Sequence, residues 1–265
     1  MVGPVMRDLT DAEVRSFLER GWVFTPGLIR AEAATGMRDA AEEMLRGTDY
    51  KSVTSYVDDA FRAAHHPERT IPLAHDVVLS PVTGRNCARL LRGNPRVRML
   101  QSTLLAKWGA ADDGQHGPTP YHQDFPGHAL DRSEMLTIWI ALNDITPDMG
   151  SLRFCEGSHR FGALGRSFVR AGDDAFSQHP WLKDLPLSPP LTLRPGDATI
   201  HHGLTIHGAP RNTTHDPRIV LQALYVDAAA LYNGARLNKR WDAAGLKLHE
   251  TLDNPEFPLL PADLV

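Results

Sequence analysis

The chain has 265 residues and a net charge of −4, with a pI of about 6.3. This balance provides no basic surface for nucleic acid or an anionic membrane, and no segment approaches the roughly 20 apolar residues that a membrane span needs. The size fits one domain, and two cysteines, Cys87 and Cys155, with a start that lacks a signal-like apolar run, predict a cytoplasmic protein without disulfides.

Three helices are predicted in the N-terminal part. A capping box at residues 10–13 begins the first, and Gly21 ends it. The second covers residues 31–45 and the third residues 81–91, each followed within two residues by a glycine that suits a helix end. Between these two helices, residues 48–75 show no firm period. The segment is either a surface connection or a lid over an active site, and the sequence leaves both open.

Alternating apolar residues predict strands from residue 97 onward. Residues 97–107 form one strand, and residues 135–142 give the clearest alternation. In the second strand leucine and isoleucine occupy one face, whereas Thr137, Trp139 and Ala141 occupy the other. We expect the first face to pack against the helices and the second to face a barrel interior. Further strands are predicted at residues 191–193, 198–202 and 218–227.

The remaining segments complete a single domain over residues 1–265. Residues 194–197, Arg-Pro-Gly-Asp, predict a tight turn between two strands. Residues 156–190 contain several glycines and prolines and are typical of an insertion, and residues 237–248 predict a closing helix. The sequence contains no internal repeat and no linker between domains.

Two histidines and an aspartate have the spacing of a metal site. His122 and Asp124 lie two residues apart, so both side chains of a strand would project to the same side. Two imidazoles and one carboxylate bind non-haem Fe(II) on one face and leave the opposite face open. Three residues compete for the third ligand, and they are His201, His202 and His207. His207 is favoured, because the two small residues after it let a backbone approach the metal.

Arg218 follows His207 by eleven residues and adds a second element to this site. Its planar guanidinium matches a carboxylate in two hydrogen bonds, so it suits one end of a dicarboxylate beside the metal. Together these residues predict an oxygen-activating enzyme that uses 2-oxoglutarate. The segment His66-Pro67-Glu68 also has a histidine two residues before an acidic residue, and it is interpreted as a chance match to the motif.

Several segments in order resemble the phytanoyl-CoA dioxygenase family of Fe(II)/2-oxoglutarate oxygenases. The resemblance covers about residues 96–227 and is looser before them. It is carried by Tyr121-His122-Gln123-Asp124, the strand 136–142, Gly150-Ser151-Leu152, Gly157-Ser158-His159-Arg160, Arg194-Pro195-Gly196-Asp197 and the stretch 207–218.

The resemblance implies a mainly β fold with added helices. Its core would be a double-stranded β-helix, a cupin-like jelly roll, over residues 96–227, flanked by a helical part at 1–95 and a tail at 228–265. The cofactors would be Fe(II), 2-oxoglutarate as cosubstrate, and O2. The residues implied are His122, Asp124 and His207 as catalytic metal ligands, Arg218 at the distal carboxylate of 2-oxoglutarate, and Trp139, Thr103 and Gln101 as further cosubstrate contacts.

The strand residues implied as cosubstrate contacts also have purely structural interpretations. Trp139 has the alternative of a core aromatic residue. Gln101, Thr103 and Lys107 share one strand face, which either reaches cosubstrate or substrate or is simply solvated. Asp124 argues against halogenation, because halogenating relatives replace this carboxylate with a small residue.

The predicted function is an Fe(II)/2-oxoglutarate dioxygenase acting on a small organic substrate. Hydroxylation, epimerisation, ring closure and desaturation stay open, and so does the oligomeric state. The composition and the family favour tailoring of a bacterial natural product, such as an antibiotic, with no nucleic-acid or membrane partner. Two alternatives remain, a cupin-like Zn or Mn metalloenzyme acting as isomerase or hydrolase, and a catalytically silent barrel that binds a small molecule.

Overall fold

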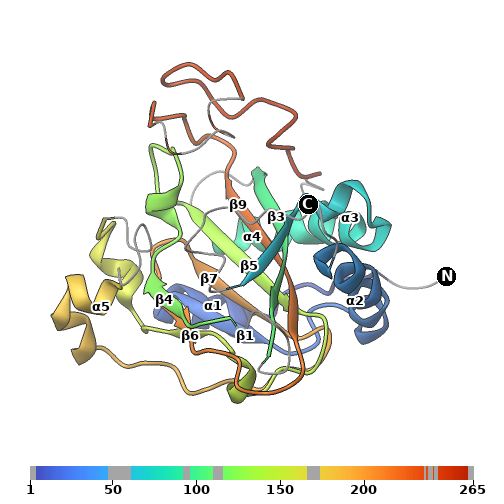
Figure 1. Ribbon diagram of the computed structural model, residues 1–265. Helices are drawn as coiled ribbons and strands as arrows, with labels where there is room; N and C mark the ends of the chain where they lie inside the picture. The colour runs from blue at the N-terminus through green and yellow to red at the C-terminus, as the bar shows by residue number, and fades with distance from the viewer. Residues whose placement is uncertain are drawn as a thin grey trace.

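Two antiparallel sheets form the centre of the molecule (Figure 1). The computed structural model describes residues 4–46, 61–91, 96–109, 116–165, 174–235, 237, 241 and 244–261. In spatial order, the larger sheet contains β1 (Trp22–Thr25), β7 (Ala198–His202), β5 (Met135–Ala141), β9 (Arg218–Asp227), β3 (Val97–Lys107) and β2 (Arg62–His65). The smaller sheet contains β4 (Thr119–His122), β8 (His207–Ala209) and β6 (Arg153–Phe154). This arrangement confirms the predicted double-stranded β-helix with N-terminal helices.

The helices lie outside the two sheets. Figure 1 shows α2 and α3 on one side of the molecule and α5 on the opposite side, next to the smaller sheet. The α-helices are α1 (Asp11–Arg20), α2 (Ala31–Arg46), α3 (Pro72–Val78), α4 (Pro81–Leu90) and α5 (Ala175–Gln178). Short 3-10 helices are η1 (Pro67–Arg69), η2 (Phe125–Gly127), η3 (Pro147–Met149), η4 (Ser158–Phe161) and η5 (Pro180–Asp184). The three helices predicted from sequence correspond to α1, α2 and α4.

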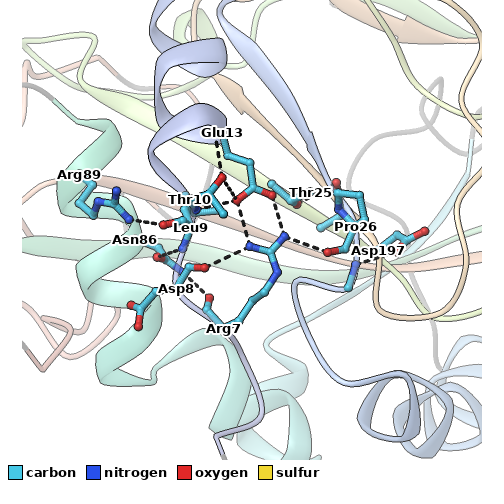
Figure 2. A network of polar contacts seen from close by, with 12 residues as sticks. Arg7, Asp8, Leu9, Thr10, Glu13, Thr25, Pro26, Asn86, Arg89 and Asp197 are labelled. Carbon is cyan, nitrogen blue, oxygen red and sulfur yellow. Dashed lines mark hydrogen bonds and ion pairs between the residues drawn. The ribbon is translucent and has the colours of Figure 1, made fainter.

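The start of α1 is held by the predicted capping box. The Thr10 hydroxyl accepts from the Glu13 backbone N–H, and the Glu13 carboxylate accepts from the Thr10 N–H. Gly21 ends the helix with a φ of 80°, a left-handed conformation that glycine adopts without strain. Figure 2 shows Arg7 donating both to Glu13 and to the carbonyl of Pro26. These contacts fix the helix against the loop that follows β1.

The alternation in β5 separates two hydrophobic cores, as predicted. Leu136, Ile138 and Ile140 pack in the core that the helices cover. Trp139 and Ala141 lie in a second core between the sheets, where Phe154 of β6 joins them. The face that carries Trp139 is therefore the inner face of the barrel.

The N-terminal part contains two strands that the helical prediction missed. β1 pairs with β7 at one edge of the larger sheet, and β2 pairs with β3 at the other. Each strand has four residues, which is too short to show a clear period. The suggested lid at 48–75 therefore includes β2, η1 and the start of α3. Residues 48–60 lie outside the described residues, and a lid there stays a prediction.

Two predictions on the later part of the chain are wrong. Residues 191–193 form no strand, because only Leu193 pairs, in an isolated bridge to Ile145 after two prolines that cannot donate. The closing helix predicted at 237–248 does not continue through residues 244–248, which form turns around Gly245 at a φ of 66°. Residues 238–240 and 242–243 of that prediction lie outside the described residues.

The predicted insertion at 156–190 lies between β6 and β7 and contains η4, α5 and η5, with residues 166–173 outside the described part. Residues 194–197 form the predicted turn before β7, although the segment directly before the turn, residues 191–193, is not a strand. None of the described helices has the length and apolar character needed to cross a membrane.

Candidate active site

Two neighbouring strands of the smaller sheet bring the predicted metal ligands together. His122 at the end of β4 pairs in register with His207 at the start of β8. The two imidazole Nε2 atoms lie 3.5 Å and 3.7 Å, respectively, from Oδ1 of Asp124. One ligand atom of each residue lies within 4.8 Å of the others, as a shared metal ion requires. His201 and His202 are not part of this group.

Backbone carbonyls set the orientation of both imidazoles. Nδ1 of His122 lies 2.8 Å from the carbonyl of Pro120, and Nδ1 of His207 lies 3.0 Å from that of Thr205. A carbonyl only accepts, so each Nδ1 carries the proton and each Nε2 keeps its lone pair. Burial, aided by the neighbouring His201, lowers the pKa of His207 well below its usual range. Both rings present Nε2 toward Asp124, and His207 does so as the neutral imidazole that binds metals.

Asp124 is buried, and its two oxygens have different neighbours. Oδ2 accepts from the Thr137 hydroxyl at 2.7 Å and lies 3.1 Å from Nε2 of His201. Burial opposes ionisation, but the neighbouring rings of His207, His122 and His201 hold the pKa of the Asp124 carboxyl well below its usual range. The carboxylate is therefore ionised at neutral pH, with Oδ1 directed toward the two ligand imidazoles.

The small residue after His207 is needed for the packing of two strands. A Cβ atom at Gly208 would lie 2.9 Å from the carbonyl oxygen of Thr119 and 3.0 Å from the Tyr121 ring. Gly208 thus permits close packing of β8 against β4, and approach of the backbone to a metal stays a prediction. The effect on the site is indirect, because this packing holds His207 beside His122.

Arg218 lies at the opposite end of the barrel interior. It is 2% exposed, donates through Nη1 to the carbonyl of Gly150, and has its guanidinium carbon 5.2 Å from the centre of the Trp139 ring. Its Nε has no hydrogen-bond partner within the described part of the chain. Burial lowers the pKa of Arg218 to about 9, so the side chain is still charged at neutral pH. A buried cation with an unused N–H fits a carboxylate ligand.

Several known proteins are similar to this chain in sequence and fold. A model of the family "Phytanoyl-CoA dioxygenase (PhyH)" matches residues 17–220. The chain belongs to this family. Phytanoyl-CoA dioxygenase 1 of Oryza sativa subsp. japonica is 26% identical over 84% of this chain and 91% of its own.

Solved structures share the fold over nearly the whole chain. The non-heme alpha-ketoglutarate-dependent carbocyclase SnoK from nogalamycin biosynthesis superposes with a TM-score of 0.81, 26% identity, and 98% and 100% of the two chains covered. The epimerase SnoN, solved with Fe3+, alpha-ketoglutarate and nogalamycin RO, gives a TM-score of 0.77 at 23% identity, over 95% and 98% of the chains.

The protein is an Fe(II)- and 2-oxoglutarate-dependent dioxygenase of the phytanoyl-CoA dioxygenase family. The cupin-like Zn or Mn enzyme and the silent barrel, which the sequence left open, gain no support from any of these matches.

The remaining predicted cosubstrate residues line the inner face of the larger sheet of this dioxygenase. Thr103 is 2% exposed and accepts from Nε2 of Gln101 at 3.0 Å. Nδ1 of His65, on β2, lies 3.2 Å from the Thr103 hydroxyl. In register, Thr103 faces Gln222 of β9, which in turn faces Trp139. The strand face is therefore interior rather than solvated, and Trp139 packs in the core while also lying beneath Arg218.

His66 and His202, which are not part of the metal trio, have local hydrogen-bond partners. Nδ1 of His66 lies 3.1 Å from Oε1 of Glu68, whose other oxygen accepts from the Ser102 hydroxyl. His202 accepts from the Leu204 N–H at 3.1 Å. Both residues serve local structure away from Asp124.

Sequence reasoning gave no role to three residues that the structure places at the candidate site. They are Thr137 and His201 at Asp124, and His65 at Thr103. Lys107, which pairs in register with Arg218, was named only as part of the strand face whose role the sequence left open. Thr137 had a signal, because its place on the inner face of β5 was predicted. The roles of His65 and His201 depend on long-range strand pairing, which no local pattern reveals.

Proposed function

We propose that His122, Asp124 and His207 hold the Fe(II) of this dioxygenase, and that Arg218 binds the distal carboxylate of 2-oxoglutarate. The observation that carries the proposal is the convergence of three ligand atoms within 4.8 Å on the inner side of a barrel that also contains a buried arginine. Two imidazole nitrogens and an ionised carboxylate suit a divalent metal with positions left for other ligands.

The protein's own residues position the reactants. Bound Fe(II) and 2-oxoglutarate would supply O2 activation, with the cosubstrate leaving as succinate and carbon dioxide. The carbonyls of Pro120 and Thr205 orient the imidazoles, and Gly150 orients the Arg218 guanidinium. Thr103, Gln101 and Trp139 lie on the inner face of the larger sheet and are proposed cosubstrate contacts. Fixed groups at both ends would present one C–H bond of a small substrate to the metal.

We further propose that the substrate is a natural-product intermediate. The similarity to a carbocyclase and an epimerase, both from nogalamycin biosynthesis, supports this class over a fatty acyl thioester. The outcome at the C–H bond would be hydroxylation, epimerisation, ring closure or desaturation. Asp124 supplies the carboxylate ligand that halogenating relatives lack, so halogenation is not proposed.

The first test is cosubstrate dependence. Anaerobic addition of Fe(II) and then 2-oxoglutarate should produce the visible charge-transfer band of a chelated keto acid. With O2 and a cognate substrate, succinate should form in step with product, and without substrate only slowly. Zn(II) in place of Fe(II) is the control and should give no band. Product formed at an unchanged rate without 2-oxoglutarate would contradict the proposal.

A second test concerns Lys107, the neighbour of Arg218 in register. Its Nζ donates to the carbonyl of Gly117 at 2.6 Å and to the Thr119 hydroxyl at 3.1 Å. Burial, with the nearby Arg218 charge, lowers the pKa of Lys107 to about 6. The amine is thus neutral at pH 8, and a carboxylate bound at Arg218 would raise its pKa again.

Cosubstrate binding above pH 6 would therefore take up a proton at Lys107. We expect the affinity for 2-oxoglutarate to fall as pH rises from about 6 to about 8, and to be nearly constant just below about 6, where Lys107 is already protonated. Lys107→Met should bind more weakly at pH 6 and lose this slope. Titrations of the charge-transfer band at several pH values measure both curves, and parallel profiles for the two proteins would exclude Lys107 from the binding event.

A further inference from the structure

The two oxygens of Asp124 are held in different ways. Oδ1 faces Nε2 of His122 and of His207 at 3.5 Å and 3.7 Å. Oδ2 accepts the Thr137 hydroxyl at 2.7 Å and is 3.1 Å from Nε2 of His201. One oxygen is thus directed toward the ligand imidazoles, and the other toward two groups that are not part of the metal trio.

The protonation of His201 follows from its surroundings. Its side chain is 1% exposed, and its ring packs against His207 and Phe154, with ring centres 4.1 Å and 5.4 Å away. Nδ1 is buried and has no hydrogen-bond partner among the described residues. A proton on Nδ1 would leave a buried donor unsatisfied and would point the Nε2 lone pair at a carboxylate. Nε2 is therefore the ring nitrogen that donates a hydrogen bond to Asp124.

The larger sheet fixes both donors. Thr137 of β5 and His201 of β7 are directly paired in the antiparallel register, and both project from the inner face. Their positions relative to each other are set by backbone hydrogen bonds, so neither donor depends on a flexible loop. Asp124 itself lies just after β4 in the smaller sheet, so this contact also joins the two sheets across the barrel.

We propose that Thr137 and His201 are positioning residues that hold Asp124 as a one-oxygen ligand of the metal. With two donors on Oδ2, the carboxylate cannot turn to bind through both oxygens without breaking these bonds. A two-oxygen carboxylate would occupy a further metal position, which 2-oxoglutarate and O2 require. This inference rests on the proposed metal site, and it gives His201 a role distinct from that of a ligand.

The test uses three variants and Co(II), whose visible absorption depends on the number and arrangement of its ligands. Thr137→Val removes the hydroxyl at nearly constant volume, and His201→Phe removes the donor while keeping a ring against Phe154. His201→Gln restores an N–H donor. The matched control is Thr199→Val on β7, because the Thr199 hydroxyl is equally buried and has no partner among the described residues.

We expect Thr137→Val and His201→Phe each to weaken Co(II) binding by about 10- to 100-fold, the usual cost of losing a partner of a metal ligand. Both should alter the Co(II) spectrum, whereas His201→Gln and Thr199→Val should resemble wild type. Unchanged spectra and affinities in Thr137→Val and His201→Phe would overturn the inference. If His201→Phe does not fold, Thr137→Val decides the question alone.

The metal site is tested separately in the same assay. Wild-type protein that binds no Co(II), or Asp124→Ala that binds it as wild type does, would refute the proposed metal site itself. Wild-type binding that is lost in Asp124→Ala but unaffected in Thr137→Val would refute only the positioning role.

Discussion

Replacing His207 by alanine is expected to abolish iron-dependent turnover, whereas His201→Ala should keep measurable iron binding. His207 Nε2 lies on the Oδ1 side of Asp124, within the group of three ligand atoms. His201 reaches only Oδ2, through a hydrogen bond. The loss of metal affinity in His207→Ala should therefore exceed the 10- to 100-fold that loss of an outer partner typically costs. Anaerobic Fe(II) binding and succinate formation measure the two effects.

Both variants leave a cavity in the interior, so both need a folding control. His207 and His201 are each buried to a similar degree, and both truncations leave a space beside Phe154. Similar thermal unfolding of the two proteins would show that packing is not the cause of a difference in iron binding. Iron lost in His201→Ala and kept in His207→Ala would reverse the assignment of the third ligand.

The long strands could be predicted from the sequence because alternate residues pack in two different environments. In β5, Leu136 and Ile138 contact the helical core and Trp139 the barrel interior, so the period of two appears directly in the residue types. The strands that hold the ligands give no such signal. β4, β8 and β6 have four, three and two residues. The His-x-Asp spacing predicted a strand that includes Asp124, but β4 ends at His122, and Asp124 has a helical backbone conformation at the start of η2.

The choice among three histidines illustrates what local sequence lacks. His201, His202 and His207 lie within seven residues, and all of them can bind a metal. The pairing of His122 with His207 in one sheet, and of Thr137 with His201 in the other, decides which ring faces which oxygen of Asp124. These pairings join residues far apart in the chain, so the spacing favoured His207 but gave no role to His201.

Arg218→Lys is expected to raise the 2-oxoglutarate requirement with little change in iron affinity. Lysine keeps the positive charge but loses the planar pair of N–H groups that matches a carboxylate. A charge-assisted hydrogen bond contributes about 1.5 to 3 kcal/mol. Its loss corresponds to roughly tenfold to a hundredfold weaker cosubstrate binding. Titration of the charge-transfer band with 2-oxoglutarate, in wild type and variant, measures the change.

The alternative for Arg218 is a purely structural role, and Arg98 provides the matched control. Arg98 is also largely buried on a neighbouring strand, but it pairs with Asp253 at 2.8 Å and donates to the carbonyl of Phe257. Among the described residues Arg218 forms no such ion pair, and its guanidinium donates to the Gly150 carbonyl. Arg98→Lys should therefore lower thermal stability and leave the cosubstrate curve unchanged, whereas Arg218→Lys should shift the curve. Superimposable curves for wild type and Arg218→Lys, with a lower melting temperature, would remove Arg218 from the cosubstrate site.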